Sequence, residues 1–168
     1  MFLSRTREKN KNREGFTLAE LLVVVAIIAI LVAVSIPIFT GKLEETRETT
    51  DIANMRAAKA AAVEALLSED YKTSWLEYGG YYTAVFDADR GVFVGDGSYG
   101  KAYGQGTEKD AGMTYYPNGE PSKSNNVEGK VYFTYDGSKS YKGFLIDAVI
   151  EEKVGKVTLR WFTNESED

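Results

Sequence analysis

The amino-acid sequence predicts an α+β fold in which one long N-terminal helix precedes an antiparallel sheet. An apolar run begins at Phe16 and passes into an alanine-rich amphipathic pattern that ends near Glu69, as expected for one helix in two parts. Beyond residue 130, apolar and polar residues alternate with the period of two that is typical of strands with one buried face. Residues 71–126 between these patterns are rich in glycine and tyrosine, and we expect a long loop region there.

The composition narrows the possible classes of function. The 168 residues suffice for one domain plus an anchor. Cysteine is absent, which excludes disulfides and thiolate chemistry, and histidine is absent, which removes the commonest metal ligand and general base. No nucleophile–base pair stands out, although paired carboxylates would leave no sequence signature, so we expect no enzyme and no cofactor. The net charge of −5 argues against electrostatic binding of nucleic acid.

The first 15 residues form a basic leader ahead of the apolar run. They hold five Lys and Arg residues and two acidic residues, so their removal would change the net charge from −5 to −8. Positive charge at this end predicts that the N-terminus stays in the cytoplasm and that the C-terminus is exported. An ordinary secretory signal peptide is the alternative, because Ala33-Val34-Ser35 offers a small-x-small site after an apolar core.

The apolar run itself, residues 16–39, would form about 36 Å of helix, which exceeds the ~30 Å hydrocarbon core of a bilayer. We therefore expect residues 16–41 to be a membrane-spanning helix. Pro37 removes a backbone donor inside it and predicts a kink. Glu20 is the only charge in the run, and a charge deep in lipid costs on the order of 2.5–3.5 kcal/mol. A plain anchor gains nothing from that cost, so we expect the carboxylate to have another purpose.

The second part of the helix presents an apolar stripe that we expect to pack on a sheet. Its members are Ile52, Met55, Ala62, Val63, Leu66 and Leu67. Alternation predicts strands over residues 131–135, 144–151 and 157–162, and the short turns between them predict an antiparallel meander. Val92-Phe93-Val94 is a further short strand candidate inside the loop region.

Two stretches look like ligand-binding motifs. Residues 95–100 fit G-x-G-x-x-G, but the glycines that follow argue against the helix that a dinucleotide site requires. Residues 87–91 begin like an EF-hand loop, yet Gly91 and Ser98 stand where the pattern needs ligands. A loop calcium site that uses Asp87, Asp89 or Asp96 stays open, as does a ligand for the tyrosine-rich loops. We assign no catalytic and no metal-binding residue.

Residues 15–22 read Gly-Phe-Thr-Leu-Ala-Glu-Leu-Leu, and this string resembles the processing signature of type IV pilins and the related pseudopilins. The basic leader, the apolar run and Pro37 also fall where that family has them, so the resemblance covers about residues 1–60. It implies that a prepilin peptidase cuts between Gly15 and Phe16, that Phe16 is then N-methylated, and that Glu20 helps to dock the subunit into a filament. It also implies that residues 1–15 are removed and that residues 42–168 form an exported globular domain.

The function that this resemblance implies is that of a structural subunit of a type IV pilus-like filament. The precursor would cross the cytoplasmic membrane once, and the trimmed subunit would polymerise through its apolar helix into an extracellular homo-oligomer. The membrane, the peptidase and the pilus assembly machinery would be its partners. A pseudopilin of a type II secretion or DNA-uptake apparatus is one alternative, and a membrane-anchored adhesin or enzyme domain is another. Because many Gram-negative relatives have a C-terminal disulfide, the lack of cysteine favours a Gram-positive source.

Overall fold

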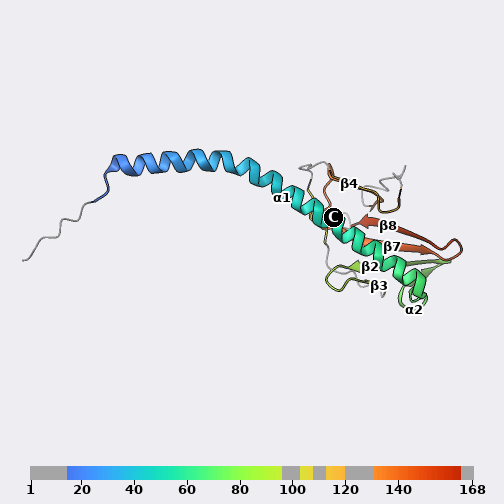
Figure 1. Ribbon diagram of the computed structural model, residues 1–168. Helices are drawn as coiled ribbons and strands as arrows, with labels where there is room; N and C mark the ends of the chain where they lie inside the picture. The colour runs from blue at the N-terminus through green and yellow to red at the C-terminus, as the bar shows by residue number, and fades with distance from the viewer. Residues whose placement is uncertain (1–14, 96–102, 108–112, 120–130, 164–168) are drawn as a thin grey trace, which may run out of the picture. The chain divides into compact units, whose positions relative to one another are not determined.

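The computed structural model describes residues 15–95, 103–107, 113–119 and 131–163. By its internal contacts the chain divides into two units, residues 1–39 and 40–168. Helix α1, Leu18–Ser68, contributes residues to both units (Figure 1). The predicted long N-terminal helix is confirmed, although it begins two residues later and ends one residue earlier than expected.

The first unit holds the apolar part of α1. The large apolar side chains between Leu18 and Phe39 are exposed; Leu18 is 82% exposed and Phe39 is 68% exposed. Among the described residues, α1 is the one helix that is long and apolar enough to cross a membrane, by length and composition. Pro37 lies inside α1, and the helix continues through it without a break. The kink at Pro37 stays a prediction.

The described part of the second unit carries two antiparallel sheets. The larger has the strand order β1-β2-β7-β8-β5, and β3 also pairs with β2. Its strands are β1 Leu76–Tyr78, β2 Tyr81–Asp87, β3 Val92–Val94, β5 Val131–Tyr132, β7 Leu145–Glu151 and β8 Lys156–Phe162. The smaller sheet pairs β4, Thr114–Tyr115, with β6, Tyr135–Asp136. A short helix, α2, Tyr71–Ser74, follows α1.

The α+β class and the antiparallel sheet are confirmed, but the predicted meander is wrong in its first strand. Residues 131–135 divide between two sheets: Val131 pairs with Phe162 of β8, whereas Tyr135 pairs with Tyr115 of β4. As a result β8 lies between β7 and β5. Tyr135 leaves the larger sheet because its ring stacks on Tyr141, with the two ring centroids 4.4 Å apart.

The region predicted as loop, residues 71–126, contains a central strand and is the second correction. The first residues of β2 pair with β1 on one side and with β7 on the other, and its last three residues pair with β3. The burial of β2 alternates along the strand, with Tyr82, Ala84 and Phe86 in the core. Tyr81 and Tyr82 place large aromatic rings on both faces, which hides the period of two in the sequence. The short strand expected at Val92–Val94 is confirmed as β3.

One face of the larger sheet packs on the second part of α1 (Figure 1). Met55, Ala58 and Ala62 of α1 are 0% exposed and form a core with the inward side chains of β2, β7 and β8. The predicted stripe is wrong for Val63 and Leu67, which are exposed at 37% and 80%. A single residue step turns the helix by about 100°, so neighbours of buried positions face away from the sheet.

The other face of the larger sheet carries an ion pair between a buried carboxylate and a half-buried guanidinium. The guanidinium of Arg160 donates from Nε and Nη2 to the carboxylate of Asp147, with the shortest contact at 2.6 Å. Burial raises the pKa of Asp147, and the Arg160 guanidinium partly offsets that rise. Since Asp147 alone would be an uncompensated buried charge, the pair ties β7 to β8.

Candidate functional site

The start of α1 is organised by hydrogen bonds between Thr17 and Glu20. The backbone N–H and the hydroxyl of Thr17 both donate to Oε2 of Glu20, at 2.8 and 2.7 Å. The backbone N–H of Glu20 donates back to the Thr17 hydroxyl at 3.2 Å. This reciprocal pattern is a capping box, and it explains why the helix begins at Leu18 rather than at Phe16. The carboxylate of Glu20 is thereby held at the helix N-terminus, where the helix dipole favours negative charge.

Gly15 and Phe16 lie outside the helix, immediately before this capping box. The Phe16 side chain is 92% exposed, and a Cβ added at Gly15 would meet nothing within 4 Å. The fold of this chain therefore does not require glycine at residue 15. A requirement for glycine there would have to come from another molecule that binds this junction.

Comparison with known proteins bears on this segment. A family model described as the prokaryotic N-terminal methylation motif matches residues 10–36. This segment therefore carries the N-terminal methylation motif, which is a signal of type IV pilins. Two fimbrial proteins of Pseudomonas aeruginosa are each 44% identical to the chain over 57 residues. These matches cover 34% of this chain and 37% of each of those proteins, so the chain spans little more than a third of the curated relatives' length. No solved structure gives a significant match.

The resemblance to type IV pilins is therefore confirmed over this N-terminal segment. The roles of Gly15, Phe16, Glu20 and Pro37 stay predictions, because none of these findings tests a single residue. The capping box was not predicted. Its signal was present, since Thr17-Leu18-Ala19-Glu20 has the S/T-x-x-E spacing ahead of an apolar run.

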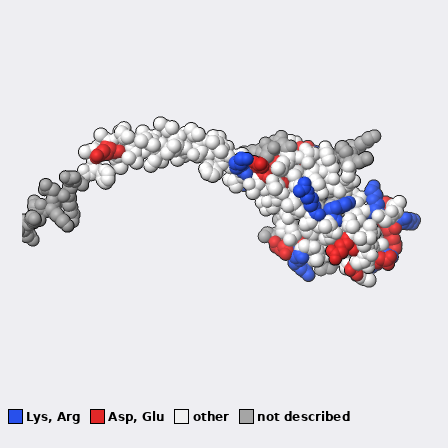
Figure 2. All heavy atoms as spheres, viewed as in Figure 1, with Lys and Arg blue, Asp and Glu red and all other residues white. Residues whose placement is uncertain are grey.

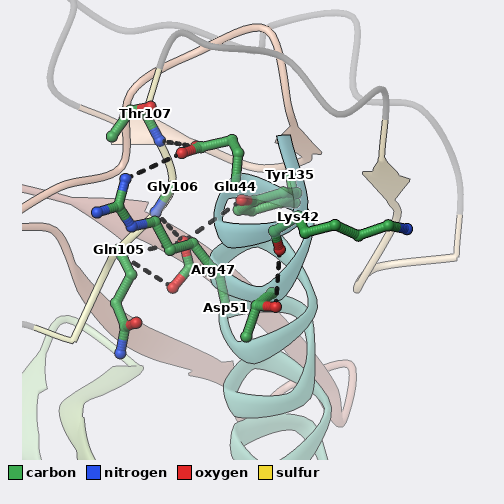
Figure 3. A network of polar contacts seen from close by, with 9 residues as sticks. Lys42, Glu44, Arg47, Asp51, Gln105, Gly106, Thr107 and Tyr135 are labelled. Carbon is green, nitrogen blue, oxygen red and sulfur yellow. Dashed lines mark hydrogen bonds and ion pairs between the residues drawn. The ribbon is translucent and has the colours of Figure 1, made fainter. Parts of the chain in front are cut away.

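A second group of carboxylates lies on the buried side of α1, within the second unit. Glu44, Glu48 and Asp51 are at most 2% exposed, and their spacing of four and three residues places them on one side of the helix. Figure 3 shows Glu44 and Asp51 among their polar contacts. We call this group of three carboxylates the acidic row. Acidic residues on a helix are usually exposed to solvent, whereas these three are buried. The sequence reveals the spacing of these residues but not their burial.

The acidic row accepts hydrogen bonds from the backbone of distant segments. Asp51 accepts the N–H of Gln105 at 2.9 Å and that of Gly106 at 2.8 Å. Glu44 accepts the N–H of Thr107, as Figure 3 shows. In the same way, the N–H of Met113 donates to Glu48 at 3.2 Å. The row therefore fastens residues 105–107 and residue 113 to the helix.

Close approach of the chain to the acidic row depends on glycine. A Cβ at Gly137 would lie 2.8 Å from both carboxylate oxygens of Glu48, and a Cβ at Gly106 would lie 2.5 Å from the hydroxyl of Tyr135. Tyr135 itself donates its hydroxyl to Asp51 at 3.4 Å. Two of the glycines that the sequence presents as loop residues thus leave room for carboxylate and hydroxyl groups.

The electrostatics of the acidic row differ from residue to residue. Burial raises the pKa of Asp51 to about 6, against the lowering effect of the hydrogen bonds from Gly106 and Gln105. At Glu44 burial also acts upward, but the hydrogen bonds from Thr107 and the guanidinium of Arg47 outweigh it and lower the pKa. Because these carboxylates are covered and bound to backbone donors, they have the properties of structural fasteners and are not open to a substrate.

The open calcium hypothesis concerns the turn after β2. Oδ1 of Asp87 accepts the N–H of Asp89 at 3.1 Å, the N–H of Arg90 at 3.2 Å and the hydroxyl of Tyr103 at 3.0 Å. Asp87 thus closes this turn with protein donors. The residues that the structure describes contain no group of three Asp, Glu, His or Cys side chains that could hold a metal ion. Asp96 lies outside the described residues.

The G-x-G-x-x-G pattern lies outside the described residues except for its first glycine. A Cβ at Gly95 would lie 2.1 Å from the carbonyl oxygen of Ser74 and 2.4 Å from Cα of Trp75. This glycine therefore lets the end of β3 pass close to the end of α2. Several tyrosines also have a structural role, since Tyr71, Tyr82 and Tyr141 belong to the core.

Proposed function

We propose that the protein is a structural subunit of a type IV pilus-like filament. The observation that carries the proposal is the apolar part of α1, whose large side chains are exposed around the helix. In Figure 2 this part is white except for one acidic group near its start. Such a surface is stable in lipid and equally stable against other helices of the same kind, so a filament core can take the place of the bilayer. The proposed role is assembly and not catalysis.

The proposed route begins with a precursor whose N-terminus faces the cytoplasm, by the positive charge of the leader. A prepilin peptidase then cuts between Gly15 and Phe16, and Phe16 receives an N-methyl group. The exposed junction supports this step, because a peptide bond outside a helix is accessible to an enzyme. The trimmed subunit leaves the membrane for an extracellular filament with the help of assembly machinery. A Gram-positive source remains part of this proposal.

In this route Glu20 sets the position of each subunit along the filament. Trimming creates a charged amine on Phe16, and both this amine and the Glu20 carboxylate are costly in an apolar environment unless they are paired. We propose that Glu20 of one subunit binds the Phe16 amine of its neighbour. Apolar helices alone can slide past one another at little cost, so one ion pair fixes their register.

Two measurements on sheared cells test the proposal. Electron microscopy is expected to show filaments, and mass spectrometry is expected to identify this chain as their component. N-terminal sequencing of the exported protein should begin at Phe16, and Gly15→Val should block that trimming. An N-terminus at Ile36 without filaments would mean cleavage of an ordinary signal peptide and would exclude the filament subunit. A processed chain that never appears in sheared material would favour a pseudopilin or an anchored surface protein.

A further inference from the structure

The exposed side of α1 in the second unit forms a groove, which we call the α1 groove. It has a volume of about 750 Å³ and is lined by Arg56, Lys59, Val63, Glu64, Leu67 and Tyr115 among other residues. The aliphatic side chains in it are accessible, with Leu67 exposed at 80% and Val63 at 37%. Figure 2 shows basic groups among white atoms on the face over which α1 lies. The α1 groove is thus both apolar and basic.

Among the residues that the structure describes, the two cations of the α1 groove have no acidic partner in contact. The guanidinium of Arg56 lies 5.2 Å from the ring centroid of Tyr115, and partial burial lowers the pKa of Lys59. Within the described ranges, neither cation has a carboxylate oxygen within 4.0 Å. Of the described residues that line the groove, Glu64 is the one carboxylate. Two cations beside accessible aliphatic side chains fit a partner surface that is acidic and apolar.

We infer that the α1 groove docks a second copy of this chain, through an acidic and partly apolar surface of that copy. The charge of the chain supports this choice of partner, because the net charge is −5, and −8 once the leader is lost. The inference rests on the proposed function. Association of the apolar helices would hold the globular units at an effective concentration in the millimolar range, where a weak contact is populated.

The charge of the groove also decides the symmetry of the contact. Two α1 grooves face to face would bring Arg56 and Lys59 against the same cations of the partner, and like charges in contact are unfavourable. The groove of one copy must therefore meet a different surface of the next. Such a heterologous contact does not close on itself after two subunits, and it is compatible with an open-ended filament.

The test reverses the charge of the groove in the full chain. Arg56→Glu combined with Lys59→Glu is expected to reduce sheared filaments about tenfold or more, while the level of trimmed subunit in the membrane is unchanged. Lys142→Glu combined with Lys153→Glu changes the net charge equally at exposed positions outside the groove, and its filament yield should stay within about twofold of wild type. Wild-type filament yield from the groove variant would overturn the inference.

A cross-linking measurement guards against a variant that fails to fold. A photoreactive amino acid at Val63, in an otherwise unchanged chain, should give an adduct of twice the subunit mass whose peptides all come from this chain. An adduct with another protein, or no adduct between copies, would overturn the inference. The adduct is sought in membranes as well as in filaments. It therefore tests whether the α1 groove contacts a second copy even where filaments are absent. Absence of wild-type filaments would count against the proposed function alone.

Discussion

Asp51 illustrates how burial changes the charge of a single residue in this chain. Its side chain is 0% exposed, and burial raises its pKa to about 6 although two backbone N–H groups donate to it. In the unfolded chain an aspartate has a pKa of about 3.9. The folded chain therefore holds this proton to a higher pH, and the contribution of Asp51 to stability is full below the unfolded pKa and lost as the pH rises through the folded one.

We expect the titration of Asp51 to lower the free energy of unfolding by about 2 kcal/mol between pH 4 and pH 7. Denaturant unfolding of the full chain in detergent micelles at several pH values measures this fall. Asp51→Asn cannot titrate, so most of the fall should disappear in that variant. Asp89→Asn, at an exposed position, should keep the wild-type pH dependence. The same slope in Asp51→Asn and wild type would contradict the raised pKa.

At the scale of the elements, replacing glycine by alanine should change the stability of the chain in opposite directions at two positions. A Cβ at Gly41 would meet nothing within 4 Å inside α1, so Gly41→Ala should stabilise the chain by about 0.5–1 kcal/mol. A Cβ at Gly104 would lie 1.8 Å from the carbonyl oxygen of Tyr141, so Gly104→Ala must move backbone and should cost about 1–3 kcal/mol. Unfolding followed by circular dichroism compares the two variants, and the reverse order of stabilities would show that the Gly104 contact is wrong.

The elements also show what the sequence can predict. The helix was predictable because its signal is local, and the strands β7 and β8 were predictable because their alternation is regular. The strand β2 was missed, since aromatic side chains stand on both of its faces and read as a loop rich in tyrosine. The division of residues 131–135 was missed because it depends on Tyr135 reaching Asp51 of α1 and Tyr115 of β4, and these are contacts between residues distant in the sequence.

The candidate sites divide in the same way. Gly15, Phe16 and Glu20 could be proposed from the sequence because a short motif holds them, and the Thr17 cap was visible at the same spacing. The acidic row could not be proposed. Its residues have the spacing of a solvated helix surface, and their partners are backbone N–H groups more than 50 residues away, which no residue type identifies.

For the whole molecule, the proposed route requires Glu20 to serve first in lipid and then in a filament. Glu20→Ala is expected to leave expression and trimming largely intact and to stop or greatly reduce assembly. Glu20→Gln keeps the shape and loses the charge, so its defect should be intermediate or equally severe. Electron microscopy of sheared material gives the yield, and wild-type filaments from Glu20→Ala cells would leave this carboxylate without its proposed role.

Thr17→Ala separates the two uses of Glu20. It removes the hydroxyl that bonds the carboxylate but keeps the charge and the backbone N–H of residue 17, so loss of the cap should cost about 1 kcal/mol of helix stability. Filaments should still assemble. A Thr17→Ala defect as severe as that of Glu20→Ala would mean that Glu20 acts by capping the helix and not by pairing with a neighbour.

The acidic row has a consequence for how the outside of this protein can change. The donors that Glu44, Glu48 and Asp51 engage are main-chain amides, and nearly every amino acid carries the same amide. Outside the glycines that give the carboxylates room, the side chains of the fastened segments are therefore interchangeable without loosening their attachment. A chain built in this way can exchange the chemistry of its outer surface one residue at a time while its helix stays the same.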